Sequence, residues 1–373
     1  MKRKLKSIIK IGKKSIKGFI KEKIIKSKPE VESDVFHSFN EIKSENWKKW
    51  ESQHSEEYKK YREEWVKYPK ELKVAPHPLH LDIEVSSRCN LKCPFCSRTQ
   101  RLEQGNWRKP GDIKIDLYKE VIDQAVENNV YALNLNVIGE PFLNKNFLEM
   151  VKYAKDKGIL DVFFHTNAVL LNEKKSRELI SSGLDKLIIS FDSPYKEKYE
   201  RVRVGAKYEQ VLNNVKRFKR IRDEMGSITP VTRINFIKLP GVTKQEIEDM
   251  VTLFEPLVDS IGLLDYIESD NEVRVKADYP KDYKSKFVCS QLLTRMVVYD
   301  DGRVFPCCSD YDDGLEIGDI KNETLAEIWQ GDRLNEIRKK HFEGKFFELD
   351  ACAKCDYALQ ADGFENREIA EEY

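Results

Sequence analysis

The chain has 373 residues, and its 65 Lys and Arg residues almost balance its 64 Asp and Glu residues. A balanced charge gives no general indication of a nucleic-acid partner, and no run of about twenty apolar residues suggests a transmembrane helix. The length is sufficient for one large domain and one small domain, each with its own core. Eight cysteines grouped at ligand spacing favour reduced thiolates in a reducing, cytoplasmic compartment over a disulfide scaffold.

The first 28 residues are strongly basic, with twelve Lys or Arg residues and the single acid Glu22. The apolar residues of this segment fall on one side of a helical wheel: Leu5, Ile8, Ile9, Ile16, Phe19 and Ile20. Such a pattern is typical either of a disordered, solvated tail or of a helix on an anionic membrane surface. Residues 1–30 are therefore predicted to form a basic tail, with peripheral membrane association as the alternative.

A polar helix is predicted from Ser44 to Leu72. Its aromatic residues offer a stripe for packing: Trp47, Trp50, Tyr58, Tyr61 and Trp65. The segment from Pro76 to Pro78 ends this helix, because proline breaks regular structure. Residues 31–78 are therefore predicted to form a helical extension that precedes the main domain.

Strands and helices alternate after this boundary. The predicted strands are Leu81–Val85, Ala132–Val137, Val162–His165, Lys186–Phe191, Thr232–Ile237 and Ser260–Leu264. The predicted helices between them are Asp116–Asn128, Lys145–Lys157, Glu173–Ser182, Tyr208–Arg222 and Lys244–Phe254. This alternation predicts an α/β fold in which residues 79–270 form a partial (β/α)6 TIM-like barrel of parallel strands. Functional groups are expected in the loops at the carboxyl ends of the strands.

Three cysteines, Cys89, Cys93 and Cys96, lie in the loop after the first predicted strand. A structural zinc site or a closed iron–sulfur cluster needs four protein ligands, so a tight triplet suggests a cluster with one iron left open. A zinc site completed by His80 or a distant cysteine is one alternative. Buried thiols without a ligand role are another.

Polar residues also follow the next strands. Gly139 in Ile138-Gly-Glu-Pro141 allows close backbone approach, and Glu140 supplies an acceptor for a positive group. The other candidates in such positions are Asn167, Ser190, Asp192 and one of the two arginines Arg201 and Arg203. Each of these segments can also be a simple turn or a solvated helix surface.

Two apolar runs, Met296–Tyr299 and Arg303–Pro306, flank Asp300-Asp-Gly302 and predict a β-hairpin. The cysteines around and after this hairpin that could share one metal centre are Cys289, Cys307, Cys352 and Cys355. Four such thiols suit a closed [4Fe–4S] cluster, but a zinc ribbon has the same spacing. Cys308 is then left over as a small buried apolar side chain.

The C-x3-C-x2-C run, with Phe95 directly before the third cysteine, resembles the radical S-adenosylmethionine superfamily. The resemblance implies a [4Fe–4S] cluster whose open iron binds S-adenosylmethionine, which is then cleaved reductively to a 5′-deoxyadenosyl radical. It also implies a flavodoxin or ferredoxin-type electron donor. Ile138–Pro141 resembles the superfamily's GGEP motif, although Ile138 replaces one glycine.

Three further segments resemble cofactor-binding parts of the same superfamily. His165–Ala168 is similar to its TNG turn, with alanine in the last place, and Ile189–Ser193 is similar to its S-x-D segment. Glu197–Gly205 resembles the stretch whose arginine pairs with the methionyl carboxylate. The resemblance thus assigns the cofactor to Phe95, Gly139, Glu140, Asn167, Ser190, Asp192 and Arg203.

The C-terminal pattern C-x12-G-x4-C, followed by C-x2-C, resembles the SPASM or twitch auxiliary domain, as does the segment Gly318–Gln330. A full SPASM domain has further cysteines where this chain has Ala361 and Glu365. The resemblance therefore implies a small α+β domain at residues 271–373 with one auxiliary [4Fe–4S] cluster, bound by Cys289, Cys307, Cys352 and Cys355.

Taken with the residues, this resemblance predicts an enzyme that removes a hydrogen atom from its substrate. A single closed cluster favours oxidation of a small hydroxylated substrate, such as a sugar or cyclitol, with the cluster as electron acceptor. A peptide-modifying maturase, a redox-neutral epimerase or rearrangement enzyme, and a non-catalytic zinc or iron–sulfur protein remain alternatives. No Ser-His-Asp arrangement or P-loop indicates other chemistry, and no catalytic residue is assigned.

Overall fold

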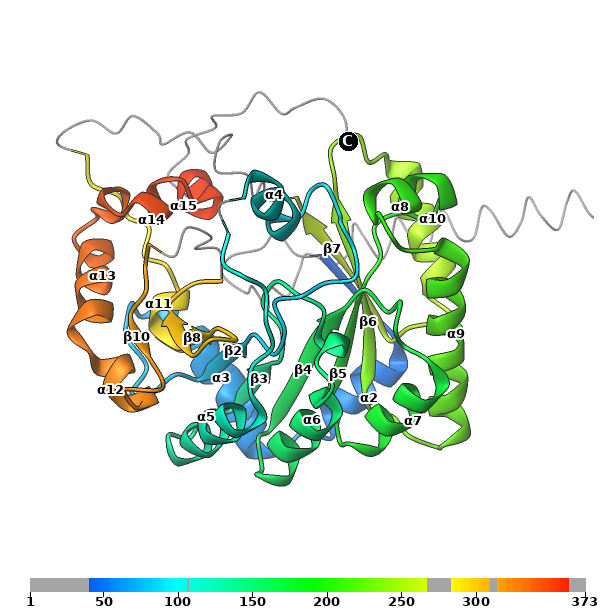
Figure 1. The fold of residues 1–373 in the computed structure, drawn as a ribbon, viewed down its shortest axis with the longest axis horizontal. Helices are drawn as coiled ribbons and strands as arrows, with labels where there is room; N and C mark the ends of the chain where they lie inside the picture. Colours follow the sequence, from blue (N-terminus) through cyan, green and yellow to red (C-terminus); the bar gives the residue numbers. More distant parts are fainter. Residues whose placement is uncertain (1–39, 106, 267–282, 309–313, 362–373) are drawn as a thin grey trace, which may run out of the picture.

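The computed structural model describes residues 40–105, 107–266, 283–308 and 314–361, which are built around one sheet (Figure 1). Its described strands are β1 Asn40–Lys43, β2 His80–Ile83, β3 Ala132–Asn134, β4 Asp161–Thr166, β5 Lys186–Ser190, β6 Val231–Lys238, β7 Ser260–Asp265, β8 Arg295–Val298, β9 Arg303–Phe305 and β10 Gly318–Asp319. They pair in the order β1-β7-β6-β5-β4-β3-β2-β8-β9-β10. The predicted basic tail at residues 1–30 and the position Glu365 lie outside the described residues.

Strands β2 to β7 correspond to the six predicted strands, and all neighbours among them pair in parallel. The helices that follow or connect them are α4 Ser97–Gln104, α5 Ile115–Glu127, α6 Phe147–Asp156, α7 Glu173–Ser181, α8 Lys196–Val202, α9 Tyr208–Glu224 and α10 Lys244–Phe254, with the short 3-10 helix η1 at Pro141–Leu143. Figure 1 shows α5, α6, α7 and α9 along the outside of the strands. The predicted α/β fold with a partial barrel is confirmed.

The two faces of the barrel strands differ because successive side chains point to opposite faces. In β4, Val162 and Phe164 have no exposed surface, and the Phe164 ring centre lies 4.6 Å from that of Phe147 in α6. Phe163 and His165, on the opposite face, remain partly exposed. The apolar face therefore packs against the helices, and the inner face is left for polar side chains.

The N-terminal extension differs from its prediction. A short strand, β1, comes first and pairs antiparallel with the edge strand β7. The predicted single helix is wrong, because the segment forms two helices, α2 Glu45–Ser52 and α3 Glu56–Lys70. Ser44 and Ser55 each accept a hydrogen bond from a backbone N–H of the helix that follows, so each starts a separate helix.

The aromatic stripe of this extension packs against the amino ends of the barrel strands. The hydroxyl of Tyr58 donates to Asp161 at the start of β4, over 3.3 Å. The Trp65 ring lies 5.6 Å from the ring of His80 at the start of β2. Lys186, the first residue of β5, places its ammonium 5.6 Å from the centre of the Trp50 ring. The extension thus covers the end of the barrel opposite to the cysteine loop.

The C-terminal region continues the barrel sheet. The predicted hairpin is confirmed, since β8 and β9 pair antiparallel, and β8 also pairs in parallel with β2. The remaining elements are α11 Gln291–Thr294, α12 Leu325–Gln330, α13 Asp332–Phe342, η2 Phe346–Glu348, α14 Asp350–Ala353 and α15 Asp356–Ala361. Trp329 in α12 donates from its indole N–H to the Ala75 carbonyl at 3.0 Å, which fixes α12 to the segment before β2.

Every helix in the described part of the chain is too short or too polar to cross a bilayer.

Asp259 is a buried junction between the extension and the barrel. Its carboxylate accepts hydrogen bonds from Arg222 of α9, from Thr232 of β6 at 2.6 Å and from Asn46 of α2 at 2.7 Å. Arg222 and Asp259 are each about 4% exposed. The carboxylate of Asp259, paired with Arg222, therefore holds α9, β6 and α2 together.

We expect Arg222→Ala to destabilise the fold by roughly 3–5 kcal/mol, because it leaves a buried carboxylate without its cation. Thermal unfolding followed by circular dichroism would measure this loss. Arg220→Ala is the matched control, since Arg220 lies in the same helix and its ion pair with Glu224 is exposed. Equal effects of the two substitutions would contradict the role assigned to Asp259.

Candidate active site

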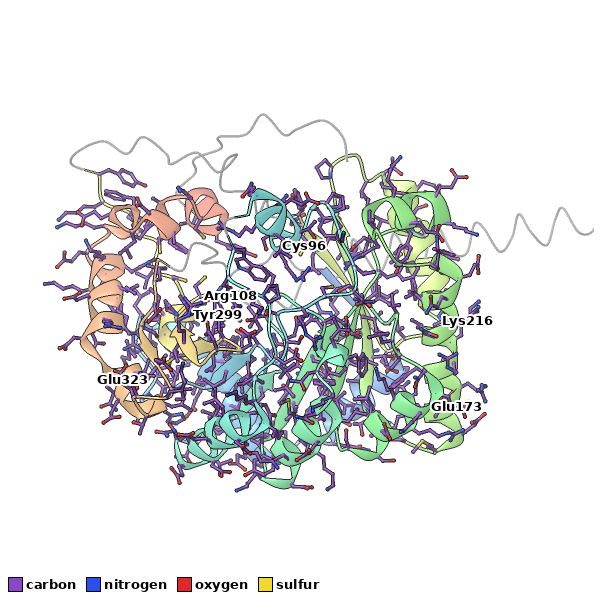
Figure 2. The ribbon with its side chains drawn as sticks, in the orientation of Figure 1. Cys96, Arg108, Glu173, Lys216, Tyr299 and Glu323 are labelled. Atoms are coloured by element: carbon purple, nitrogen blue, oxygen red, sulfur yellow. The ribbon has the colours of Figure 1, made fainter. Side chains whose placement is uncertain are left out.

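The loops that carry the predicted site residues meet at the carboxyl ends of the parallel strands. The cysteine loop leads from β2 to α4, and Cys96 is the N-cap residue of that helix. Figure 2 labels Cys96 at this end of the barrel. The loops after β3 and β4 are hydrogen-bonded to the cysteine loop or to each other, as the contacts below describe.

The three thiols of the cysteine loop are largely shielded from solvent. Cys93 is buried, Cys89 and Cys96 are half-buried, and none of them forms a disulfide. Burial raises the pKa of Cys93 to about 12, although the nearby Arg203 acts in the opposite direction. Burial also raises the pKa of Cys89, whose sulfur accepts a hydrogen bond from the Leu91 N–H at 3.4 Å. Thiolates in such surroundings need a positive partner, so these residues suit a metal centre.

Gly139 brings the loop after β3 into backbone contact with the cysteine loop. The neighbouring Glu140 N–H donates to the Arg88 carbonyl at 2.7 Å. A Cβ atom at Gly139 would lie 1.9 Å from the Ser86 carbonyl oxygen and 2.7 Å from that of Arg88. No side chain fits in this space. Glycine is therefore required here for the close approach of two loops.

The carboxylate of Glu140 joins the same loop to the end of β4. Glu140 is 1% exposed, and it accepts hydrogen bonds from the Thr166 hydroxyl at 2.8 Å and the Asn167 N–H at 2.9 Å. Burial raises its pKa, and these hydrogen bonds act against that shift. The Phe142 N–H is a third donor, at 3.3 Å. A carboxylate has about four acceptor positions, so one remains for the predicted ammonium contact, which stays a prediction.

Asn167 and Ser190 stand at the carboxyl ends of neighbouring strands. The Asn167 side-chain amide donates to Asn90 Oδ1 at 2.9 Å and lies 3.9 Å from the Cys89 sulfur. Ala168 has a φ of +55°, a left-handed conformation that glycine adopts more easily. Ser190 ends β5 and is partly exposed. Asn167 therefore contacts the cysteine loop directly, whereas Ser190 lies on the inner face of the barrel.

The structure places Arg203 beside two other predicted cofactor residues. Its Nε donates to Asp192 Oδ2 at 2.5 Å, and its guanidinium lies 5.3 Å from the centre of the Phe95 ring. Asp192 has no exposed surface, and its second oxygen accepts the Ile237 N–H at 3.2 Å. Arg201, by contrast, is exposed on α8. Of the two arginines, only Arg203 reaches the cysteine loop.

The second group of thiols lies around the hairpin and α14. Burial raises the pKa of Cys289 to about 12, and the nearby Cys355 adds to this shift. A hydrogen bond with Cys308, and then burial, raise the pKa of Cys307, to which Cys289 and Cys355 also contribute. The Cys355 N–H donates to the Cys352 carbonyl at 3.0 Å, which turns the C-x2-C pair. Cys289, Cys307 and Cys355 thus lie close enough to affect one another's pKa, and the turn joins Cys352 to Cys355.

Cys308 has a different environment from its prediction. It is half-buried and packs against Val297, Tyr299 and Phe305, but its sulfur also accepts a hydrogen bond from Arg295 at 3.2 Å. The expectation of a buried, purely apolar side chain is therefore only partly met, because a guanidinium from β8 reaches the thiol.

Neither thiol group is arranged around a single point. Among the described residues, no three Cys, His, Asp or Glu side chains converge closely enough to hold a single metal ion. Zinc would require such convergence, because Zn–S bonds are only about 2.3 Å long. In an iron–sulfur cluster, each cysteine binds a different iron, so the thiols can lie further apart. An iron–sulfur cluster is therefore compatible with thiols that do not converge on one point.

Two buried residues near the cysteines carry no sequence motif and were missed. His341 accepts the Cys289 N–H at 3.4 Å on Nδ1, and burial lowers its pKa to about 4, which keeps it neutral. Arg98 donates from Nε to the Ser87 carbonyl at 2.7 Å, directly before the cysteine run. Both residues fix the backbone around a thiol through partners distant in sequence, and single residues of these types give no signal by themselves.

Two family models match separate parts of the chain. Residues 83–254 match the radical SAM superfamily, and residues 289–356 match the iron–sulfur cluster-binding SPASM domain. The chain belongs to the radical SAM superfamily. It is a radical SAM enzyme with a C-terminal SPASM domain. Its cofactors are a [4Fe–4S] cluster that binds S-adenosylmethionine and one or more auxiliary iron–sulfur clusters in the SPASM domain.

Curated relatives of this radical SAM chain differ in their activities. The tungsten-containing aldehyde ferredoxin oxidoreductase cofactor-modifying protein of Pyrococcus furiosus is 25% identical over 78% of this chain and 90% of its own. A PqqA peptide cyclase of Bradyrhizobium diazoefficiens is 24% identical, with shares of 75% and 79%. The S-adenosyl-L-methionine-dependent 2-deoxy-scyllo-inosamine dehydrogenase of Niallia circulans is 22% identical, with shares of 74% and 92%.

A solved structure supports the fold. Streptococcus suis SuiB bound to its precursor peptide SuiA superposes with a TM-score of 0.57 and 16% identity. The match covers 89% of this chain and 83% of SuiB. At this identity, the likeness establishes the common fold and not a common substrate.

We expect Gly139→Ala to abolish reductive cleavage of S-adenosylmethionine, because the added methyl group forces the two loops apart. The measurement is 5′-deoxyadenosine formation by the reduced enzyme. Gly226→Ala is the control, since its Cβ meets nothing within 4 Å although the glycine has a φ of +65°. A normal cleavage rate in Gly139→Ala would contradict the tight contact.

We expect replacement of Cys89, Cys93 and Cys96 by Ala to remove cofactor cleavage while iron remains at the SPASM domain. The reason is that the triplet alone would hold the cluster with the open iron. Iron and acid-labile sulfide analysis after anaerobic purification would measure what remains. Normal cleavage by this variant, or iron loss down to background, would contradict two separate cluster sites.

Proposed function

We propose that this radical SAM enzyme oxidises a small hydroxylated substrate, of the sugar or cyclitol type, and that one auxiliary [4Fe–4S] cluster accepts the electron. The observation that carries the proposal is the polar inner face of the barrel. Partly exposed side chains with hydrogen-bonding groups occur there on four neighbouring strands: Asn134, His165, Ser190, Arg233 and Asn235.

Such a lining suits a substrate rich in hydroxyl groups. The side-chain oxygen of Asn134 and that of Asn235 are buried acceptors without a hydrogen-bond partner among the described residues. The Asn134 side-chain NH2 donates to the Asp82 carboxylate at 2.8 Å, and the Asn134 side-chain oxygen has no such partner. Unpaired buried acceptors are costly, so a ligand that donates O–H groups to them would gain affinity.

His165 is a candidate proton acceptor within this lining. Burial, followed by the nearby Arg233, lowers its pKa to about 4, so its imidazole is neutral near pH 7. Asp82 and Lys186 are the other charged groups that influence it. A neutral imidazole can accept the proton of a substrate hydroxyl.

Alcohol oxidation to a carbonyl removes a hydrogen atom from carbon, a proton from oxygen and one electron. When bound, the open cluster with S-adenosylmethionine would supply the radical that takes the hydrogen atom, and the auxiliary cluster would take the electron. Gly139, Glu140, Asn167 and Arg203, with Asp192, would hold the cofactor, and Phe95 would pack beside it. His165 would take the proton, and the inner-face amides would orient the substrate.

The supply of thiols supports a single auxiliary cluster. The chain has eight cysteines, and the two proposed clusters use all of them except Cys308. Four thiolates from Cys289, Cys307, Cys352 and Cys355 leave no iron open, which favours electron transfer over substrate binding. The 2-deoxy-scyllo-inosamine dehydrogenase of Niallia circulans, 22% identical to this chain, supports the oxidation of a small substrate.

A peptide substrate is the second candidate, and it is favoured by the similarity to the PqqA peptide cyclase over 75% of this chain. A panel of cyclitols, amino cyclitols and short peptides would separate the two. The compound class that accelerates 5′-deoxyadenosine formation above the substrate-free rate identifies the substrate. Acceleration by peptides alone would overturn the proposal of a small substrate.

With an active cyclitol in hand, we expect Cys355→Ala to keep cleaving S-adenosylmethionine but to lose net oxidation, because the substrate radical has no electron acceptor. The measurement is the ratio of 5′-deoxyadenosine to oxidised product. Circular dichroism must show that the variant remains folded, since ligand loss can also unfold a small domain. Normal product at the normal ratio, without the auxiliary cluster, would instead favour a redox-neutral reaction.

A further inference from the structure

A buried ionic cluster connects the barrel with the SPASM hairpin. Arg108, in the loop after α4, donates from Nη2 to the Glu84 carboxylate and from Nη1 to the Asp300 carboxylate. Glu84 lies directly after β2 and has no exposed surface, while Asp300 lies in the turn between β8 and β9 and is 9% exposed. One guanidinium therefore binds an acid from each side of the junction.

The same aspartate reaches the cysteine loop. The Ser87 hydroxyl donates to Asp300 Oδ2 at 2.8 Å and accepts the Gly111 N–H at 2.8 Å. The Ser87 N–H donates to the Gly111 carbonyl at 3.0 Å, and its carbonyl accepts from Arg98 at 2.7 Å. All polar groups of Ser87 are thus bound, only two residues before Cys89. The conformation in which the chain enters the cysteine loop depends on these bonds.

Aromatic rings fix the position of the guanidinium. Arg108 lies 4.5 Å from the centre of the Tyr299 ring and 5.2 Å from that of Trp107. Figure 2 shows Arg108 and Tyr299 next to each other, below the end of the barrel where Cys96 is labelled. A planar fork that binds two carboxylates and stacks on a ring is a geometry that arginine provides and lysine does not.

Because Arg108, Glu84 and Asp300 are largely buried, their ion pairs matter for stability. A buried charge that loses its partner is strongly destabilising, so Arg108 and the two acids hold each other in place. Glu84 also donates its backbone N–H to the Val298 carbonyl of β8 at 2.8 Å, so main-chain and side-chain bonds join the same two segments. The hairpin cannot shift without disturbing the residues that precede Cys89.

We propose that Arg108 and Asp300 form a latch through which the SPASM hairpin sets the conformation of the loop bearing Cys89, Cys93 and Cys96. The cofactor-cleaving site is competent only while the hairpin is docked, which limits radical formation to molecules with an ordered SPASM domain. Arg108 and Asp300 are positioning residues in this scheme. The inference is independent of the substrate class, because it concerns cofactor cleavage alone.

The test is Asp300→Ala in the reconstituted full-length enzyme, with Asp301→Ala as matched control. Asp301 is the next residue of the same turn, but it is exposed, and its ion pair among the described residues is with Arg303, at 2.9 Å. Hydrogen exchange in residues 84–96 and 107–113 is expected to rise about tenfold in Asp300→Ala and to stay unchanged in the control. Cleavage of S-adenosylmethionine without substrate is expected to fall roughly ten- to hundredfold.

Two conservative variants keep the test decisive if Asp300→Ala folds poorly. Asp300→Asn retains an acceptor for Ser87 and should restore part of the cleavage rate, while Arg108→Lys should not, because it loses the fork. In both, the electron paramagnetic resonance signal of the reduced cluster with S-adenosylmethionine reports the site directly, and auxiliary iron should be unchanged. Exchange that rises only in residues 295–306, with cleavage and the cluster signal at control values, would overturn the latch.

Discussion

The parallel pairing of β8 with β2 is the constraint on which the arrangement of this enzyme depends. β2 leads into the loop with the first three cysteines, and β8 lies between Cys289 and Cys307. Because main-chain hydrogen bonds join these strands from His80 opposite Arg295 to Ile83 opposite Val298, the two thiol groups are attached to one sheet. A flexible linker between two independent domains would not hold them in a defined relation.

Buried carboxylates connect several loops at this end of the barrel. Glu140 joins the loops after β3 and β4, and Asp192 joins Arg203 to β6. Each acid is satisfied by donors from a neighbouring segment, as buried charges must be to avoid a large desolvation penalty. The residues that we propose as cofactor ligands are therefore also those that hold the loops together. Substitutions among them will combine effects on binding and on loop geometry.

The two ends of the barrel have opposite characters. At the amino ends of the strands, α2 and α3 supply a packed group of aromatic residues, with Trp47 and Trp50 each 5% exposed. At the carboxyl ends, polar loops carry the cysteines and the acids that connect them. An apolar cover at one end and a polar inner face leave the carboxyl end as the place where substrate and cofactor can meet.

How far the sequence determined this molecule can be judged from particular residues. The six barrel strands and the hairpin were predictable, because apolar alternation and an Asp-Gly turn are local signals, and cysteine spacing indicated the clusters for the same reason.

The strand Asn40–Lys43 was not predictable from the sequence, since it has one apolar residue. It forms because the edge of β7 was open to pair with it. The resemblance favoured Arg203 over Arg201, but only the tertiary structure shows that Arg203 packs against Asp192 and Phe95. Arg108 and His341 act through partners far away in the chain, and contacts of that kind are decided by the tertiary structure, because no local pattern encodes which distant residues the fold brings together.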